Sequence, residues 1–122
     1  MAWLLKTEPT EYSFADLQRD RETRWDGITN PVALKNMRSA KKGDVVVLYH
    51  TGKERQAVGL AEIAKEGEVV TVKAGKPLKK PVALATFKAD KLFKDSPLVK
   101  MGRLSFVPLT DPQLARILEL GG

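Results

Sequence analysis

The chain has 122 residues, 43% hydrophobic and 30% charged, which is typical of a single globular domain with a buried core. It contains no cysteine, which excludes disulfides, thiolate metal sites and a cysteine nucleophile and fits a reducing cytoplasm. The net charge is +6, and residues 65–103 hold 10 Lys and Arg against 4 Asp and Glu, a surplus that either attracts polyanions or only keeps the surface solvated.

The start of the chain predicts a β-strand over residues 3–6, which Pro9 ends. It lacks the basic and apolar regions of a signal peptide, and no apolar run approaches the roughly 20 residues that span a bilayer. We therefore expect a cytoplasmic, water-soluble protein without a membrane partner.

Two short helices are expected next along the chain. Ser13 is a typical N-cap for a helix that ends near Arg19, and the charged run 20–24 is expected to be a loop. Asn30 and the proline after it predict a second helix over residues 31–41. The apolar positions of this second helix are Val32, Leu34, Met37 and Ala40.

The middle of the chain predicts most of the sheet. Its clearest strand is the apolar run 45–49, which we expect at the centre of the sheet. Further strands are predicted over residues 57–64 and 69–73. Residues 75–80 form either a basic loop or an irregular extension of the strand before them, and residues 82–89 favour a helix.

The C-terminal part predicts a loop that begins at Ser96, a last strand over residues 104–109, and a helix capped at Asp111 that reaches Leu120. Strands thus alternate irregularly with short helices, and many connections are tight. We therefore predict an α+β fold in one domain, residues 1–122. Its expected form is a small, mostly antiparallel β-barrel decorated by short helices, rather than a doubly wound sheet.

Two tryptophans have different expected roles. Trp3 lies inside the first strand and is assigned to the core. Trp25 lies in a loop beside Asp26, where its ring can stack on a nucleobase, worth roughly 1–3 kcal/mol. The alternative is that Trp25 covers an edge of the core, which is the commoner fate of a lone tryptophan.

Polar side chains follow the first strand and precede the second helix. Lys6, Thr7 and Glu8 offer donors and acceptors for the edge of a base, while Glu8 can equally form a surface ion pair. Asn30 can read a base edge or cap the second helix. These two roles compete for one side chain.

His50, which follows Tyr49 at the end of the central strand, is the only histidine. A general base needs an orienting partner and a positioned substrate. Neither a serine-nucleophile motif, nor a glycine-rich phosphate loop, nor a second histidine at metal-ligand spacing accompanies it. A structural or ligand-contacting role for His50 is favoured over a catalytic one, and we expect no catalytic residue, no metal and no cofactor.

These segments resemble the EVE domain family, a branch of the PUA-like fold related to YTH domains. The likeness runs through WLLKTEPTEYSFADL, RWDGITNPVALKNMR, KKGDVVVLYHTG, AVGLAEI and PLVKMGRLSFVPLT, in this order and over nearly the whole chain. It implies a helix-decorated barrel and recognition of a modified base, including modified cytosine, in DNA or RNA. Many members carry a long insert where this chain has only a short turn at residues 66–68, which implies a more open pocket.

The resemblance also implies a site. By matching segments, the pocket would be lined by Lys6, Thr7, Trp25, Asp26 and Asn30, with Tyr49 and His50 close to it. Trp25 would then be the stacking platform for a base turned out of its strand.

The expected contacts to the nucleic-acid backbone are Lys73, Lys76, Lys79 and Lys80. One alternative is a module that docks a peptide or a partner protein through the same groove. Another, ranked behind it, is a nucleic-acid-processing hydrolase that uses His50 with Asp44 or Asp26.

Overall fold

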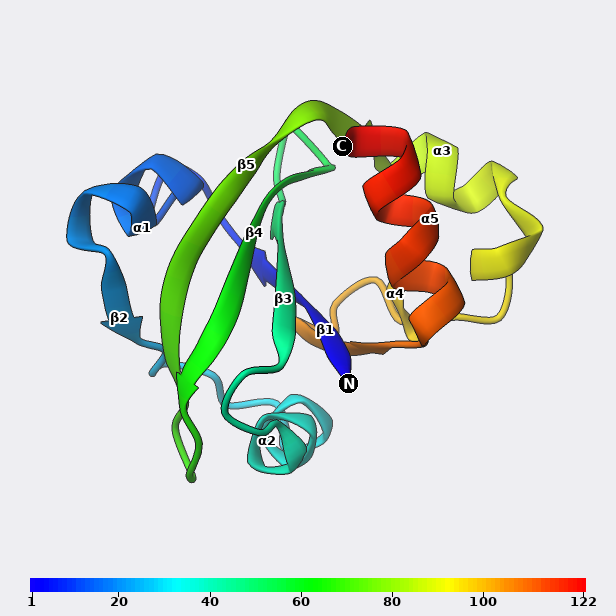
Figure 1. Ribbon diagram of the computed structural model, residues 1–122. Helices are drawn as coiled ribbons and strands as arrows, with labels where there is room; N and C mark the ends of the chain where they lie inside the picture. The colour runs from blue at the N-terminus through cyan, green and yellow to red at the C-terminus, as the bar shows by residue number, and fades with distance from the viewer.

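One curled, mixed six-stranded sheet, in the order β2-β5-β4-β3-β1-β6, forms the frame of the molecule in a computed structural model that describes residues 1–122 (Figure 1). The strands are β1 (Ala2–Thr7), β2 (Glu22–Arg24), β3 (Val45–His50), β4 (Gln56–Lys65), β5 (Thr71–Ala83) and β6 (Phe106–Leu109). The pairing of β1 with β3 is parallel, and all other pairings are antiparallel. This half-barrel with short helices confirms the predicted α+β, mostly antiparallel fold.

Short helices decorate the sheet. They are α1 (Phe14–Asp20), α2 (Pro31–Ser39), α3 (Leu84–Ala89), the 3-10 helix η1 (Lys91–Phe93), α4 (Pro97–Lys100) and α5 (Asp111–Gly121). In Figure 1, α1 and β2 lie to the left of β5, and α3, α4 and α5 lie to the right of β3. None of these helices has the length and apolar character needed to cross a membrane.

The core lies between the sheet and these helices, and Trp3 is one of its largest side chains. Its ring is 2% exposed and its centroid lies 5.3 Å from that of Phe106 on the neighbouring strand β6. Its Nε1–H donates to Asp44 Oδ2 at 3.0 Å, which satisfies the one polar atom of the side chain. The prediction that Trp3 belongs to the core is confirmed, as is the central place of β3.

Several predictions for the first half of the chain need correction. The run 20–24 is not only a loop, because residues 22–24 form β2, which pairs with β5 at the edge of the sheet. A three-residue strand of Glu, Thr and Arg has no apolar pattern, so only its distant partner reveals it. In α2 the buried positions are Ala33 and Met37, whereas Val32 is 45% exposed.

The second half needs similar corrections. The strand predicted over residues 69–73 begins at Thr71 and continues through residues 75–80 to Ala83, so the strand extension is right and the loop is wrong. The helix predicted over residues 82–89 therefore starts only at Leu84. A long, lysine-rich strand with two prolines lacks regular alternation, and its pairing with β4 decides it.

Helix starts near the C-terminus were also misplaced. Ser96 begins a helix rather than a loop, because its Oγ accepts from the Leu98 N–H at 3.1 Å and caps α4. The N-cap of α5 is Thr110, one residue before the predicted Asp111. Thr110 and Gln113 form a capping box, in which each side chain accepts from the other residue's backbone N–H.

Candidate functional site

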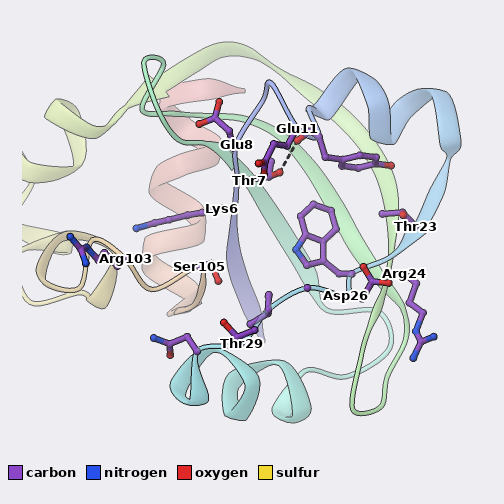
Figure 2. Close-up of a pocket in the computed structure, with 15 residues that line it drawn as sticks. Lys6, Thr7, Glu8, Glu11, Thr23, Arg24, Asp26, Thr29, Arg103 and Ser105 are labelled. Carbon is purple, nitrogen blue, oxygen red and sulfur yellow. Dashed lines mark hydrogen bonds between the residues drawn. The ribbon is translucent and has the colours of Figure 1, made fainter.

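A cavity of about 530 Å³ opens beside the end of β1, between the turn that leads to α1 and the segment that joins β2 to α2 (Figure 2). Its walls are Lys6, Thr7, Glu8, Glu11 and Tyr12, the run Thr23 to Asn30, and Arg103 and Ser105. The five residues that the resemblance assigns to the pocket, Lys6, Thr7, Trp25, Asp26 and Asn30, therefore lie in one cavity, which we call the Trp25 cavity.

The Trp25 ring is half-buried: one part packs against the core, and the residue also lines the cavity. Its backbone N–H donates to Val70 O at 2.8 Å, which extends the pairing of β2. Its indole N–H makes no hydrogen bond within the chain, and no buried side-chain nitrogen or oxygen lacks a partner, so this N–H reaches solvent. Trp25 thus serves as core cover and still exposes a polar edge beside the cavity.

Tyr12 holds Trp25 in place, and the sequence reading missed it. The two rings meet edge to face, with centroids 5.7 Å apart and an interplanar angle of 82°. The Tyr12 hydroxyl donates to Asp20 Oδ2 at 2.9 Å, and burial together with this hydrogen bond raises the pKa of Tyr12. The Tyr12 carbonyl accepts from Thr7 Oγ1 at 2.7 Å, so the Thr7 proton is committed and only its lone pairs remain for a ligand.

Asn30 performs the capping role predicted for it and keeps its amide nitrogen unpaired. Its Oδ1 accepts from the Val32 and Ala33 N–H groups at 2.9 and 3.1 Å and caps α2. Its Nδ2 has no partner in the protein, and the residue is exposed on the cavity wall. The cap therefore leaves the amide donors available.

The charged side chains of the Trp25 cavity balance. Lys6, Arg24 and Arg103 are cationic, and Glu8, Glu11 and Asp26 are anionic. Figure 2 shows Lys6 extending toward the segment that carries Arg103, and its Nζ donates to Gly102 O at 2.9 Å. Burial lowers the pKa of Lys6. The Asp26 carboxylate is exposed and makes no hydrogen bond within the chain, so it can accept one from a ligand.

The structure does not bring Tyr49 or His50 to the Trp25 cavity. His50 Nε2 accepts from the Phe14 N–H at 3.0 Å, so this nitrogen carries no proton and Nδ1–H donates to Glu54 Oε1 at 2.9 Å. The hydrogen bond from His50 holds the pKa of Glu54 below its usual range. Both ring nitrogens thus bond within the protein, which is the structural one of the two roles, structural or ligand-contacting, that the sequence favoured over catalysis.

A hydrolase built on His50 finds no support in this geometry. Asp44 lies at the other end of β3, roughly 20 Å away at about 3.3 Å per residue, and accepts from Trp3 and from the Lys41 N–H. No group of three or more His, Cys, Asp or Glu side chains lies close enough to hold a metal ion.

The four lysines predicted to contact phosphates are all exposed on β5, and none lines the Trp25 cavity. Lys73 Nζ lies 3.9 Å from Glu62 Oε1, which offsets part of its charge. Lys76, Lys79 and Lys80 make no ion pair. Their backbone role stays a prediction.

A family model for the EVE domain matches residues 1–120 of this chain. The chain belongs to the EVE domain family. A protein of Rhodopseudomonas palustris, solved by NMR, shares 33% identity and superposes with a TM-score of 0.93 over 99% of this chain and 92% of its own. Human THYN1, solved in complex with 5-methylcytosine containing DNA, shares 25% identity, with a TM-score of 0.91 over 98% and 96% of the two chains.

Chicken thymocyte nuclear protein 1 is 36% identical over 76 residues, which cover 52% of this chain and 31% of that protein. The EVE chain thus matches about a third of the length of this larger relative. These similarities establish the fold and the family of the chain.

The sequence reading missed two kinds of residue in this EVE domain site. Tyr12, Thr23 and Arg24 adjoin segments that were already singled out, and the closeness of Tyr12 to the first strand was a usable signal. Arg103 and Ser105 reach the cavity from nearly 100 residues further along the chain, through the pairing of β6 with β1. No local sequence pattern predicts that these two residues reach the cavity.

Proposed function

We propose that this EVE domain binds nucleic acid and that the Trp25 cavity receives a modified base turned out of its strand. The observation that carries the proposal is the half-buried indole at a cavity of about 530 Å³ with hydrogen-bonding walls. The human relative in complex with 5-methylcytosine containing DNA supports nucleic acid as the partner. The proposal applies to a DNA strand and to an RNA strand alike.

The base would be held by stacking and by two side chains that the fold leaves available. The indole contributes roughly 1–3 kcal/mol through stacking. Asp26 accepts from an exocyclic amine, such as that of a cytosine, and Asn30 Nδ2 donates to a ring nitrogen or carbonyl oxygen. Because neither group spends these atoms inside the protein, binding does not break an existing hydrogen bond.

Attraction to the polymer would come from elsewhere on the surface. Turning a base out of a duplex costs a few kcal/mol, and less for a base that is unpaired or damaged. The charges of the Trp25 cavity balance, so the cavity does not attract a polyanion. The exposed lysines of β5 do attract one, and they are Lys76, Lys79 and Lys80. The cavity would then discriminate between bases, and the lysines would bind any strand.

Binding, rather than catalysis, is the activity we propose. His50, the residue on which a hydrolase would depend, uses both ring nitrogens within the protein. The residues of the Trp25 cavity are suited to hydrogen bonding and stacking, and none of them is paired as a nucleophile with a base.

Intrinsic fluorescence tests the proposal directly. The chain has two tryptophans, of which Trp3 is buried and Trp25 reaches solvent, so a stacked base should quench Trp25 alone. We expect short oligonucleotides with one modified cytosine to quench at lower concentration than the unmodified sequence, in low salt. Equal quenching by both oligonucleotides, or quenching by an unrelated acidic peptide at the same concentration, would contradict base recognition.

Charge reversal tests the role of β5. The double change Lys79→Glu and Lys80→Glu should weaken the binding of modified and unmodified strands alike. It should also reduce the steepness of the salt dependence, because lysines that contact phosphates release counterions from the nucleic acid. The ratio of the two affinities should stay unchanged. A loss confined to the modified strand would contradict a backbone role and place these lysines in recognition.

A further inference from the structure

A second, smaller cavity of about 250 Å³ lies on the other side of Lys6, and we infer that it is a binding site for a phosphate group. We call it the Tyr49 cavity. Its polar walls are Lys6, Tyr49, Thr51, Arg55 and Lys88, and its apolar walls include Leu84, Leu98 and Val99. Lys6 lines both cavities, so the two sites are neighbours.

The charge of the Tyr49 cavity is of one sign. Lys6 comes from β1, Arg55 from the turn between β3 and β4, and Lys88 from α3, and no carboxylate lines the cavity. Three cations from separate elements suit an anion with several oxygens better than a single carboxylate, because each donor can meet a different oxygen. The apolar walls exclude water and strengthen such charge-assisted hydrogen bonds.

The nearby carboxylates have other partners. Glu54, which precedes Arg55, accepts from His50 Nδ1 at 2.9 Å. Glu8 Oε1 accepts from Thr10 Oγ1 at 3.1 Å, and its Oε2 accepts at 3.4 Å from the hydroxyl of Thr51, which lines the Tyr49 cavity. No carboxylate forms an ion pair with Lys6, Arg55 or Lys88, so their charges are not offset.

Tyr49 supplies the second, independent observation. The side chain is 3% exposed, yet its hydroxyl makes no hydrogen bond within the chain. Since no fully buried side-chain oxygen lacks a partner, this hydroxyl must reach the cavity that Tyr49 lines. The Lys6 Nζ lies 5.7 Å from the centre of the Tyr49 ring. A nearly buried donor that faces a cationic hollow is the arrangement that a phosphate oxygen completes.

The phosphate can come from free orthophosphate or from a nucleic-acid strand, and both present the same oxygens. The assignment of a strand phosphate rests on the proposed function: a strand whose base enters the Trp25 cavity would place an adjoining or terminal phosphate beside Lys6. The phosphate site itself stands on the residues of the Tyr49 cavity and not on base recognition.

Amide chemical shifts of the full chain provide the test, because each cavity has glycine reporters. Gly52 and Gly102 line the Tyr49 cavity, and Gly27 lines the Trp25 cavity. Three probes are titrated: inorganic phosphate, a short single strand with a 5′-terminal phosphate, and the same strand without it. We expect inorganic phosphate to shift Gly52 and Gly102 along a saturating curve while Gly27 does not move.

Variants separate a built site from diffuse attraction. Lys88→Gln and Arg55→Gln should each weaken phosphate binding roughly tenfold, and Tyr49→Phe, which keeps the ring, about threefold. Lys94→Gln changes the net charge equally at an exposed residue outside both cavities and should have no effect. A linear, unsaturated response, or equal losses in Lys94→Gln and Lys88→Gln, would overturn the site.

The two strands identify the source and keep the two proposals apart. If the 5′-phosphorylated strand binds more tightly only while Lys88 is intact, the site takes a strand phosphate. If both strands leave Gly52 and Gly102 unmoved while inorganic phosphate shifts them, the site takes free phosphate. Trp25→Ala should leave the phosphate response intact, so failure of base recognition does not remove this site.

Discussion

The Trp25 and Tyr49 cavities share Lys6 but have opposite characters. The first has about 530 Å³, three cationic and three anionic side chains, and a half-buried indole. The second has about 250 Å³, three cationic side chains and none that is anionic. The comparison indicates that shape and hydrogen bonding are suited to discriminate in the first cavity, whereas charge dominates in the second.

The two cavities also differ in how they are built. Residues 23–30, at the end of β2 and in the segment that joins it to α2, supply just over half of the residues that line the Trp25 cavity, and the Asn30 cap and Tyr12 hold this stretch in place. The Tyr49 cavity is formed by the ends of β1 and β3, the turn between β3 and β4, the helices α3 and α4, and Gly102. The proposed recognition residues thus lie largely in a connecting segment supported by the sheet, and changes in that segment should affect one cavity and spare the other.

The largest expected effect on this comparison comes from Trp25→Ala. Loss of roughly 1–3 kcal/mol of stacking should lower affinity for a modified-base oligonucleotide by about 5- to 150-fold and remove its advantage over the unmodified strand. Trp25→Phe, which keeps a smaller ring, should lose less. Circular dichroism checks the fold of both variants, and an Ala variant that keeps its preference would refute the role of the indole.

Gly59→Ala should break the frame of the Trp25 cavity. A β-carbon at Gly59 would overlap the Phe14 ring and push α1, and with it Tyr12, away from the sheet. We expect unfolding in urea to show a loss of about 1–3 kcal/mol and weaker base binding, with the phosphate response preserved. Gly102→Ala is the stability control, since a β-carbon there meets no atom within 4 Å.

Asn30→Asp separates the two roles of one side chain. The carboxylate can still cap α2, and its charge is favourable at a helix N-terminus, so the melting temperature should stay the same or rise. The amide donor is lost, so affinity for the modified base should fall about fivefold. Gln18→Glu adds the same charge at an exposed site on α1 and should have less effect; equal losses would show that only charge matters.

The smallest effect concerns the His50–Glu54 pair, which links the Arg55 turn to Phe14. Because the folded-state pKa of Glu54 lies below its ordinary value of 4.5, the pair stabilises the protein above that pH, and this contribution is lost as the pH falls through the lowered pKa. Glu54 is 41% exposed, so we expect at most about 0.5 kcal/mol.

Urea unfolding at several pH values checks this linkage. The difference in unfolding free energy between the natural chain and Glu54→Gln should be constant above about pH 5 and shrink below pH 4.5. Glu119→Gln, at an exposed residue without an ion pair, should show no such change. A difference that grows toward low pH would contradict the assigned hydrogen bond.

The placement of Tyr49 and His50 shows where sequence reasoning was incomplete. Consecutive residues of a strand point to opposite faces of the sheet, so the side chains of Tyr49 and His50 are poor candidates for the same pocket. His50 turns toward α1, and Tyr49 turns toward the second cavity. Lys6 and Thr7 are also consecutive, but both line the Trp25 cavity. They are the last two residues of β1, and the cavity lies at this end of the strand.

The sequence by itself determined the central strands, the caps at Ser13 and Asn30, the burial of Trp3 and five members of the cavity. The strands, the caps and the burial of Trp3 depend on apolar runs and on hydrogen bonds between residues a few positions apart, whereas the five cavity members were implied by the resemblance to the EVE domain family. Only the tertiary structure decided that residues 22–24 form a strand, that Arg103 and Ser105 line the same cavity as Trp25, and that Lys6 lines two cavities. Those features arise from pairing and packing between distant segments, for which the chain carries no local pattern.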